Sequence, residues 1–207
     1  MGFDLPPPVP TLEMNIASRG YSKGVAQTDG PQIVVRPEVT FGGLRIAAYG
    51  KNVTSSQFDG EIGVSIGYKI AFEKTELAGS ATVKHLVDAN PGADTSAIEL
   101  NVSIARSWGA FKPKVGLTYS PDDLAATGRS AFWEAGSTYQ LNKNFSLQAG
   151  IGIRSRTGGV DYTSFTAAAT QSIGRRFTAE VRLYDTNRDG IGDYYGRRVI
   201  VSLRARI

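Results

Sequence analysis

The stretch that decides the fold is EIGVSIGYKIAFEKTELAGSATVKHLV, residues 61–87. From Ile62 to Phe72 the even positions are apolar, while the odd positions are charged or small. A period of two is typical of a β-strand with one apolar and one polar face. After Glu73-Lys74 the alternation resumes on odd positions, from Leu77 to Val83. A two-residue hairpin turn requires this change if both apolar rows are to lie on one face. The expected cross-strand pairs are Phe72 with Thr75, Ile70 with Leu77, Ile66 with Ala81, and Val64 with Val83.

Strand-like segments of this kind follow one another along the whole chain, and none has a convincing helical period. They are expected at residues 11–19, 31–41, 44–51, 60–72, 75–87, 96–107, 111–119, 129–141, 145–155, 161–173, 177–185 and 197–207. Twelve is an even number, as found in single-chain bacterial outer-membrane barrels. The fold class is therefore predicted to be all-β, a single antiparallel up-and-down transmembrane β-barrel of about twelve strands over residues 11–207. Residues 1–10 contain Leu5-Pro6-Pro7-Pro8 and are predicted to be an exposed Pro-rich arm, a candidate docking motif for a protein partner.

The connections between these strands alternate between short and long. Tight turns are expected at Gly42-Gly43, Glu73-Lys74, Gly109-Ala110, Asn142-Lys143-Asn144 and Gly174-Arg175-Arg176, and longer joins near 20–30, 52–59, 88–95, 120–128, 156–160 and 186–196. Short turns on one rim and long loops on the other are typical of outer-membrane barrels, whose turns are periplasmic and whose loops are external. The turns also predict register, pairing Phe41 with Leu44, Val39 with Ile46, Leu141 with Phe145, and Tyr139 with Leu147.

Composition excludes several classes of protein. The chain has 207 residues, 24 glycines, no cysteine and a net charge of +4. It therefore carries no disulfide, zinc–thiolate site or thiol nucleophile, and its scattered basic residues do not indicate nucleic acid binding. No run of 18 apolar residues predicts a membrane helix, but barrel strands give a much weaker hydropathy signal. The first ten residues resemble no signal peptide, which predicts either a cytosolic protein or a chain whose leader has been removed.

Whether the apolar row or the polar row of each strand points into the barrel depends on what surrounds the barrel. A closed ring of twelve strands is wider than side chains can fill, so the apolar rows are expected to face lipid and the polar rows a wet lumen. Basic residues outnumber acidic ones in the polar rows, which favours anions in an open pore. The candidate pore-lining residues are Arg36, Glu38, Glu61, Lys69, Lys84, Glu99, Lys112, Lys114, Glu180, Arg182 and Arg204.

Aromatic residues are expected to form two belts at the membrane interfaces. One belt follows the short-turn rim and contains Phe41, Phe72, Trp108, Phe111, Phe145 and Phe177. The other lies toward the long loops and contains Tyr49, Tyr119, Trp133, Tyr162 and Tyr184.

The first third of the chain resembles the TorF family of porins. The resemblance rests on Ser18-Arg19-Gly20-Tyr21-Ser22-Lys23, a strand that starts at Pro31, the Gly42-Gly43-Leu44 hairpin, Lys51-Asn52-Val53, and the strand from Glu61 to Gly67-Tyr68. Lys23 and Lys51 depart from the Gln and Ser that are commoner in the family. The resemblance covers residues 11–72 and implies an outer-membrane β-barrel without catalytic residues.

No motif predicts catalysis. His85 is the single histidine, and both residues two positions away, Val83 and Val87, are valines, so no same-face nucleophile neighbours it along the strand. No Ser-His-Asp spacing and no phosphate-binding glycine loop is recognisable. His85 is instead expected at the lipid–water interface, where an amphipathic ring is stable. The protein is predicted not to be an enzyme.

The loop at residues 185–193 carries the one motif for a metal. Asp185, Asn187, Asp189 and Asp193 occupy relative positions 1, 3, 5 and 9, and Gly190 occupies position 6, as in an EF-hand calcium loop. The Glu expected at position 12 is replaced by a glycine, so the site would be weak. The alternative is a polar turn rich in Asp, Asn and Gly.

Three functions are consistent with the sequence. The first is an outer-membrane porin for passive diffusion of small hydrophilic solutes. The second is a closed barrel that binds a partner through its external loops or its Pro-rich arm. The third is a soluble β-barrel that holds a small ligand. Solubility without detergent separates the third from the others, and channel conductance separates the first from the second.

Overall fold

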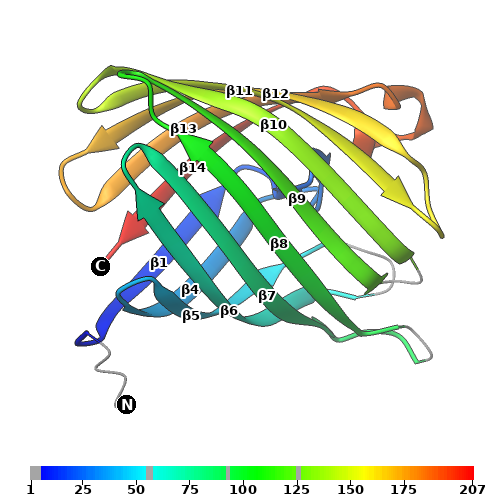
Figure 1. Ribbon diagram of the computed structural model, residues 1–207. Coiled ribbons are helices and arrows are strands. Elements are labelled where there is room, and N and C mark those ends of the chain that lie inside the picture. The colour runs from blue at the N-terminus through cyan, green and yellow to red at the C-terminus, as the bar shows by residue number, and fades with distance from the viewer. Residues whose placement is uncertain (1–5, 55–57, 92–93, 125–126) are drawn as a thin grey trace.

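The computed structural model describes residues 6–54, 58–91, 94–124 and 127–207, and the strands close into one barrel (Figure 1). Around the barrel the order of hydrogen-bonded neighbours is β1-β14-β13-β12-β11-β10-β9-β8-β7-β6-β5-β4, all antiparallel. The twelve barrel strands are β1 (Val9–Ala17), β4 (Gln32–Phe41), β5 (Leu44–Asn52), β6 (Gly60–Phe72), β7 (Thr75–Val87), β8 (Ser96–Arg106), β9 (Phe111–Asp123), β10 (Gly128–Asn142), β11 (Phe145–Arg156), β12 (Tyr162–Ile173), β13 (Phe177–Thr186) and β14 (Arg198–Arg206). The prediction of a single twelve-stranded antiparallel barrel is confirmed.

Outside the barrel wall the described residues form four small elements. Strands β2 (Tyr21–Ser22) and β3 (Val25–Ala26) make a separate two-stranded sheet within the connection from β1 to β4. Two short 3-10 turns, η1 (Asp189–Ile191) and η2 (Asp193–Tyr195), lie in the connection from β13 to β14. Among the described residues no helix is long and apolar enough to cross a membrane.

The register of the β6–β7 hairpin follows the sequence pattern. All four expected pairs are present, from Phe72 opposite Thr75 to Val64 opposite Val83. Glu73 begins the turn with φ of 49°, a left-handed conformation that a tight two-residue turn requires. The β4–β5 pairs at Gly42-Gly43 are confirmed as well.

One register prediction is wrong. Tyr139 lies opposite Leu147 as expected, but Asn142 and not Leu141 lies opposite Phe145, with a shift in register between Gln140 and Asn142. The side-chain oxygen of Asn142 accepts hydrogen bonds from the backbone N–H of Asn144 (2.9 Å) and of Phe145 (3.0 Å). This local capping favours a two-residue turn with a bulge over the three-residue turn that the composition suggests.

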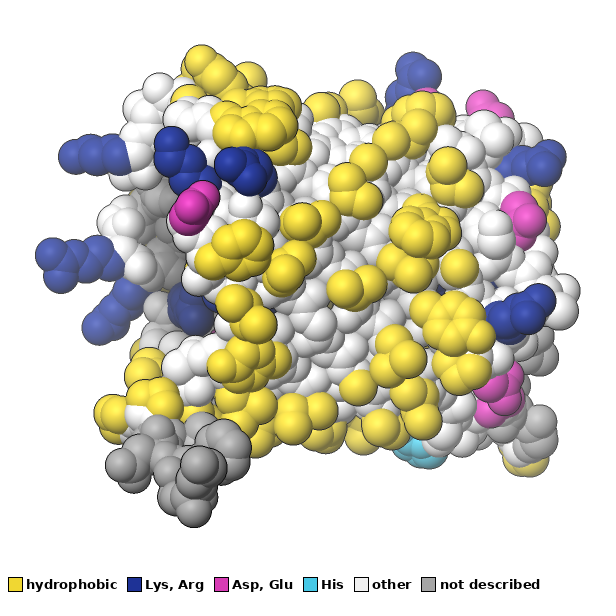
Figure 2. Space-filling view, viewed as in Figure 1, with side chains coloured by type: hydrophobic (Ala, Val, Ile, Leu, Met, Phe, Trp, Pro, Cys, Tyr) yellow, Lys and Arg dark blue, Asp and Glu magenta, His cyan; other side chains and the backbone are white. Residues whose placement is uncertain are grey.

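The apolar rows face outward, and Figure 2 shows hydrophobic side chains spread over the visible face of the wall. Ile66, in the middle of β6, is 54% exposed. The apolar rows are also predicted to place Ile62, Val64, Tyr68, Val115, Leu117, Ile151, Val181, Val201 and Leu203 against lipid. All of these are exposed except Leu117, which is half-buried. A water-soluble protein would bury this many large apolar side chains, so this surface matches a hydrocarbon environment.

The loop-side aromatic belt is wrong in part. Trp133 is 54% exposed on the outer face, but Tyr184 and Tyr162 are buried inside the barrel. Tyr49 also points inward, where its hydroxyl donates to Glu61 over 2.6 Å. The hydroxyls of Tyr49 and Tyr162 find acceptors in the lumen, the Glu61 carboxylate and the Lys23 backbone oxygen, which lipid would not supply. The Tyr184 hydroxyl has no hydrogen-bond partner, and this ring is held in the lumen by its stacking on Tyr21.

The two rims differ as the connection lengths predict. Turns of two to four residues lie on one rim, together with the start of β1 and the end of β14. The connections at 53–59, 88–95 and 187–197 lie on the other rim (Figure 1). We call these the turn side and the loop side. The largest differences from the expected bounds are at β9, which continues to Asp123 and shortens the predicted 120–128 loop, and at β1, which begins and ends two residues early. The Pro-rich arm predicted over residues 1–10 lies in part outside the described residues, which begin at Pro6.

Candidate functional site

The β2–β3 hairpin lies inside the barrel, near the loop side. Tyr21 pairs with Ala26 and Ser22 pairs with Val25, which leaves Lys23 and Gly24 as the turn. Both turn residues have positive φ, 52° and 85°, as the tightest hairpin turns require. The sequence therefore supplies a glycine at the position where a side chain would be most strained.

One face of the hairpin packs against β12 and β13. The rings of Tyr21 and Tyr184 stack with their centroids 5.9 Å apart, and Tyr184 is completely buried. The hydroxyl of Tyr162 donates to the backbone oxygen of Lys23 over 2.8 Å. A Cβ atom on Gly24 would lie 2.2 Å from the Cβ of Ser164, so the hairpin backbone touches the wall here. The hairpin is thus fixed against one side of the lumen.

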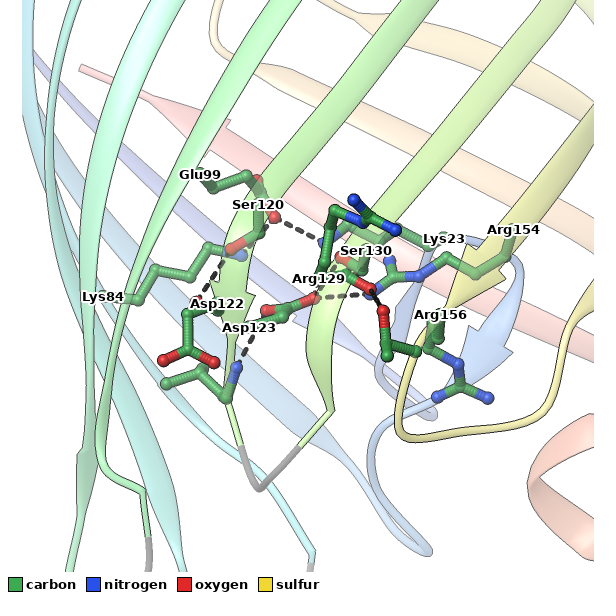
Figure 3. A network of polar contacts seen from close by, with 12 residues as sticks. Lys23, Lys84, Glu99, Ser120, Asp122, Asp123, Arg129, Ser130, Arg154 and Arg156 are labelled. Atoms are coloured by element: carbon green, nitrogen blue, oxygen red, sulfur yellow. Dashed lines mark hydrogen bonds and ion pairs between the residues drawn. The ribbon is translucent and has the colours of Figure 1, made fainter.

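The Lys23 side chain crosses from the hairpin to the opposite wall. Its ammonium group forms an ion pair with Glu99 on β8 and lies 3.8 Å from Asp123 on β9. Lys84 also pairs with Glu99, and Arg154 pairs with Asp123 over 2.5 Å (Figure 3). Two buried acids therefore hold three cations from three different segments of the chain.

Burial and neighbouring charges shift the pKa of the Lys23 ammonium group. Burial is the largest effect and disfavours the charged ammonium, and the nearby Lys84 acts in the same direction. Glu99 opposes both. The net result lowers the pKa of Lys23 to about 8.

Cavities lie above and below the hairpin. On the loop side a cavity of about 340 Å³ is lined by hairpin residues together with Asp123 and Arg154. Toward the turn side a cavity of about 420 Å³ lies against β4–β8, and a second one of about 280 Å³ lies against β9–β12. The hairpin separates these three spaces, so it narrows the lumen at the level of Lys23.

The predicted pore-lining residues all lie on the lumen side of the wall. Arg36, Glu38, Glu61, Lys84 and Glu99 line the 420 Å³ cavity. Lys69, Lys112 and Lys114 line cavities nearer the turn side. Arg182 lines the 280 Å³ cavity, and Glu180 pairs with it over 2.8 Å. Arg204 lies 3.8 Å from Glu13. Their role in conducting solutes stays a prediction.

Sequence reasoning missed the centre of this site. Lys23 was assigned to an external loop, and Asp123 to the long join at 120–128. Alternation could have extended the strand to Ser120, which continues the inward row of Lys112 and Lys114. Asp123 is at an odd position and lies inward beyond a shift in register opposite Gly128 and Ser130, which alternation does not predict. No local pattern placed Lys23 in the lumen, since its partners are 76 residues or more away along the chain.

His85 has a polar partner that the sequence did not reveal. Its Nδ1 atom lies 3.0 Å from the hydroxyl of Ser96, which is opposite His85 on β8. This hydroxyl neighbours His85 across the strands and not along one, so the residues two positions away in the sequence do not reveal it. Both side chains are exposed on the outer face, at the loop-side end of their strands.

Three of the four predicted calcium ligands are engaged by different protein donors, and the fourth is exposed. Asp185 pairs with Arg197 over 2.8 Å, and the Asn187 side-chain oxygen accepts from the backbone N–H of Thr163 over 2.8 Å. Asp189 accepts from the N–H of Gly190, while the Asp193 side chain is 96% exposed. Within the described part of the chain no three acidic or histidine side chains are grouped for a metal. Calcium binding by this loop stays a prediction that the observed geometry does not favour.

A closed barrel with an apolar outer face, a charged lumen and an inward hairpin defines a membrane channel of the outer-membrane type. A family model described as Gram-negative porin matches residues 13–191. The chain belongs to this Gram-negative porin family, and it is a porin-like outer-membrane channel for small hydrophilic solutes. The membership in a channel family also agrees with the absence of a predicted catalytic motif.

Solved structures show the same fold at low sequence identity. The KdgM porin matches with a TM-score of 0.66 and 8% identity over 94% of this chain and 98% of KdgM. The NanC porin matches with a TM-score of 0.63 and 10% identity over 94% of this chain and 97% of NanC. An outer membrane channel from Pseudomonas putida F1 matches with a TM-score of 0.58 and 11% identity over 100% of this chain and 98% of that channel. No curated protein matches the sequence.

Proposed function

We propose that this porin passes small hydrophilic anions in preference to cations. The observation that carries the proposal is the charge of the cavity walls. Twelve basic residues line the cavities against six acidic ones. The basic residues are Lys23, Arg36, Arg45, Lys51, Lys69, Lys84, Lys112, Lys114, Arg154, Arg156, Arg182 and Arg206, and the acidic ones are Glu38, Glu61, Glu76, Glu99, Asp123 and Glu134. A lumen with an excess of one charge concentrates ions of the opposite sign.

The turn-side half of the lumen supports this preference most strongly. Lys69 has no acidic partner within ion-pair distance among the described residues, and Lys112 and Lys114 lie nearby around a cavity of about 260 Å³. One structural neighbour, the KdgM porin, has been solved in complex with disordered oligogalacturonate. A sugar acid of that kind combines the negative charge and the hydroxyl groups that such a wall would accept.

The chain is also proposed to belong to the TorF branch of the porins. This part of the proposal is supported by the resemblance over residues 11–72. The outer face is proposed to contact outer-membrane lipid, and the Pro-rich arm and external loops are proposed as sites for a protein partner.

Reversal potentials in planar bilayers test the anion preference. With a tenfold gradient of potassium chloride, the sign of the potential at zero current should indicate chloride permeation. The triple variant Lys69→Glu, Lys112→Glu and Lys114→Glu should shift the preference toward cations. Arg175→Glu is the control, because Arg175 is exposed in the β12–β13 turn. A cation preference in the unmodified protein would contradict the proposal.

The second candidate is a closed barrel that does not conduct. The observation in its favour is the packing of the hairpin, which fills part of the lumen with buried ion pairs. Absence of any conductance from correctly folded protein would favour this candidate over the first.

A further inference from the structure

The hairpin divides the lumen unevenly. The loop-side cavity and the 420 Å³ cavity are both lined by Ser22, Gln27, Lys51, Glu61 and Lys84. The loop-side cavity and the 280 Å³ cavity have only Lys23 in common. The two halves of the lumen therefore adjoin along β5–β7, and they are separated along β10–β12.

The separated side is closed by direct packing. Tyr21 stacks on Tyr184, and the backbone at Gly24 touches Ser164, so these contacts leave no room for a solute between hairpin and wall. The open side is bordered by long polar side chains instead. Gln27 accepts a hydrogen bond from Lys51 over 2.9 Å, and Lys23 pairs with Glu99 at the β8 edge of this side.

We propose that solutes cross the constriction through the gap between the β2–β3 hairpin and the β5–β8 wall, and that Lys51 and Lys84 select the charge of the solute there. This inference rests on the proposed anion channel. We name this space the β5–β8 gap, bordered by Ser22, Gln27, Lys51, Glu61 and Lys84.

The charges of the gap fit a small anion. Lys51 lies 3.2 Å from Glu61, and Lys84 pairs with Glu99, which also holds Lys23. Three lysines thus face two acids, which leaves one excess positive charge at the narrowest level. Tyr49 donates to Glu61 and orients its carboxylate, so Lys51 stays in place beside it. Each ammonium group carries three N–H donors, so a permeating carboxylate can bind Lys51 or Lys84 while the glutamate keeps its own contact with that lysine.

Thiol labelling separates the two sides of the hairpin, because the chain has no cysteine of its own. Ser22→Cys places a thiol in the β5–β8 gap. Thr166→Cys is the matched control, since Thr166 is half-buried like Ser22 but lines the 280 Å³ cavity. A small anionic methanethiosulfonate reagent should label the Ser22→Cys thiol and lower single-channel conductance several-fold. The same reagent on Thr166→Cys should leave conductance nearly unchanged, with labelling measured by mass spectrometry.

A charge variant tests the lysines. Lys84→Gln should shift the reversal potential toward cation permeation, while Lys23 remains to pair with Glu99. Lys143→Gln, in the β10–β11 turn, should not change the reversal potential.

The outcomes distinguish the two proposals. If the unmodified protein prefers anions but only the Thr166→Cys variant loses conductance, or if the Ser22→Cys thiol stays unlabelled, the β5–β8 gap is not the route and the anion channel stands. If the unmodified protein does not conduct, both proposals fail together.

Discussion

The loop-side and turn-side halves of the lumen contain the same kinds of ion pair in different surroundings. On the loop side the side chains of Arg154 and Asp123 are 7% and 9% exposed. On the turn side those of Lys114 and Glu134 are 51% and 45% exposed. The wall is built by the same strands in both halves, so the difference comes from the hairpin, which replaces water on one side only.

This difference assigns separate tasks to the two halves. Buried pairs are costly to break and hold their geometry, so the loop side fixes the hairpin and the size of the opening. Exposed pairs contribute little to stability and exchange with ions in solution. The turn side therefore supplies a hydrated basic surface, while the loop side supplies the constriction.

Removing the hairpin should abolish the difference and have the largest effect. Replacing residues 21–26 with a short Gly-Ser linker opens the loop side, so single-channel conductance should rise several-fold. Anion preference should persist, because the turn-side lysines are unchanged. A deletion protein that folds and conducts like the parent would show that the hairpin does not limit the channel. Heat-modifiable migration on gels provides the control for folding.

Breaking one ion pair in each half should sharpen the comparison. Arg154→Met leaves the buried Asp123 with Ser130 and a more distant Lys23, and should lower the free energy of unfolding by about 3–5 kcal/mol. Lys114→Met breaks an exposed pair and should cost about 0–1 kcal/mol. Denaturant titration of protein folded in lipid vesicles measures both. Equal losses in the two variants would mean that the two halves do not differ in burial.

A substitution on the outer face tests whether the surface outside the lumen contacts lipid. Ile66→Arg places a charge in the middle of β6 on the lipid side, and should cost about 2–4 kcal/mol if that position lies near the bilayer midplane. Ser65→Arg, one residue away and facing the lumen, is the control and should cost much less. An effect of Ile66→Arg below a few tenths of a kcal/mol would argue against lipid exposure.

Deprotonation of Lys23 should change the charge of the loop-side half of the lumen and leave the charge of the turn-side half unchanged. Its pKa is about 8 in the folded protein against an ordinary 10.5, so the unfolded state binds more protons between these values. The free energy of unfolding contributed by Lys23 therefore rises with pH from about 8 to 10.5. Over pH 7–9 the anion preference should fall as Lys23 loses its charge. The Lys23→Met variant should show no such pH dependence of the reversal potential.

Calcium should have the smallest effect. The oxygens of Asp185, Asn187 and Asp189 already accept hydrogen bonds or pair with Arg197, so they are not free to converge on an ion. Millimolar calcium and a chelator should give the same melting temperature within error. A rise with calcium that Asp189→Ala removes would restore the predicted site.

The candidate site divides into residues that sequence could predict and residues that it could not. Wall residues such as Lys84 and Glu99 were predictable, because each occupies the polar row of an alternating strand. Tyr49, Tyr162 and Tyr184 were placed on the outer belt, since an aromatic ring suits either a lipid interface or a polar lumen. The bulge at Leu141 was missed because it depends on hydrogen bonds that the Asn142 side-chain oxygen accepts from the backbone N–H groups of Asn144 and Phe145.

The sequence by itself determined the strand count, most of the register and the facing of the wall. These properties depend on a period of two, which is local: once one face meets lipid, the pleat fixes every other side chain of the strand. Only the tertiary structure decided that residues 20–28 fold into the lumen. The contacts that hold them there join Lys23 to Glu99 across 76 residues and to Tyr162 across 139. Such contacts form when the barrel closes, because closure alone brings β8 and β12 to the same hairpin.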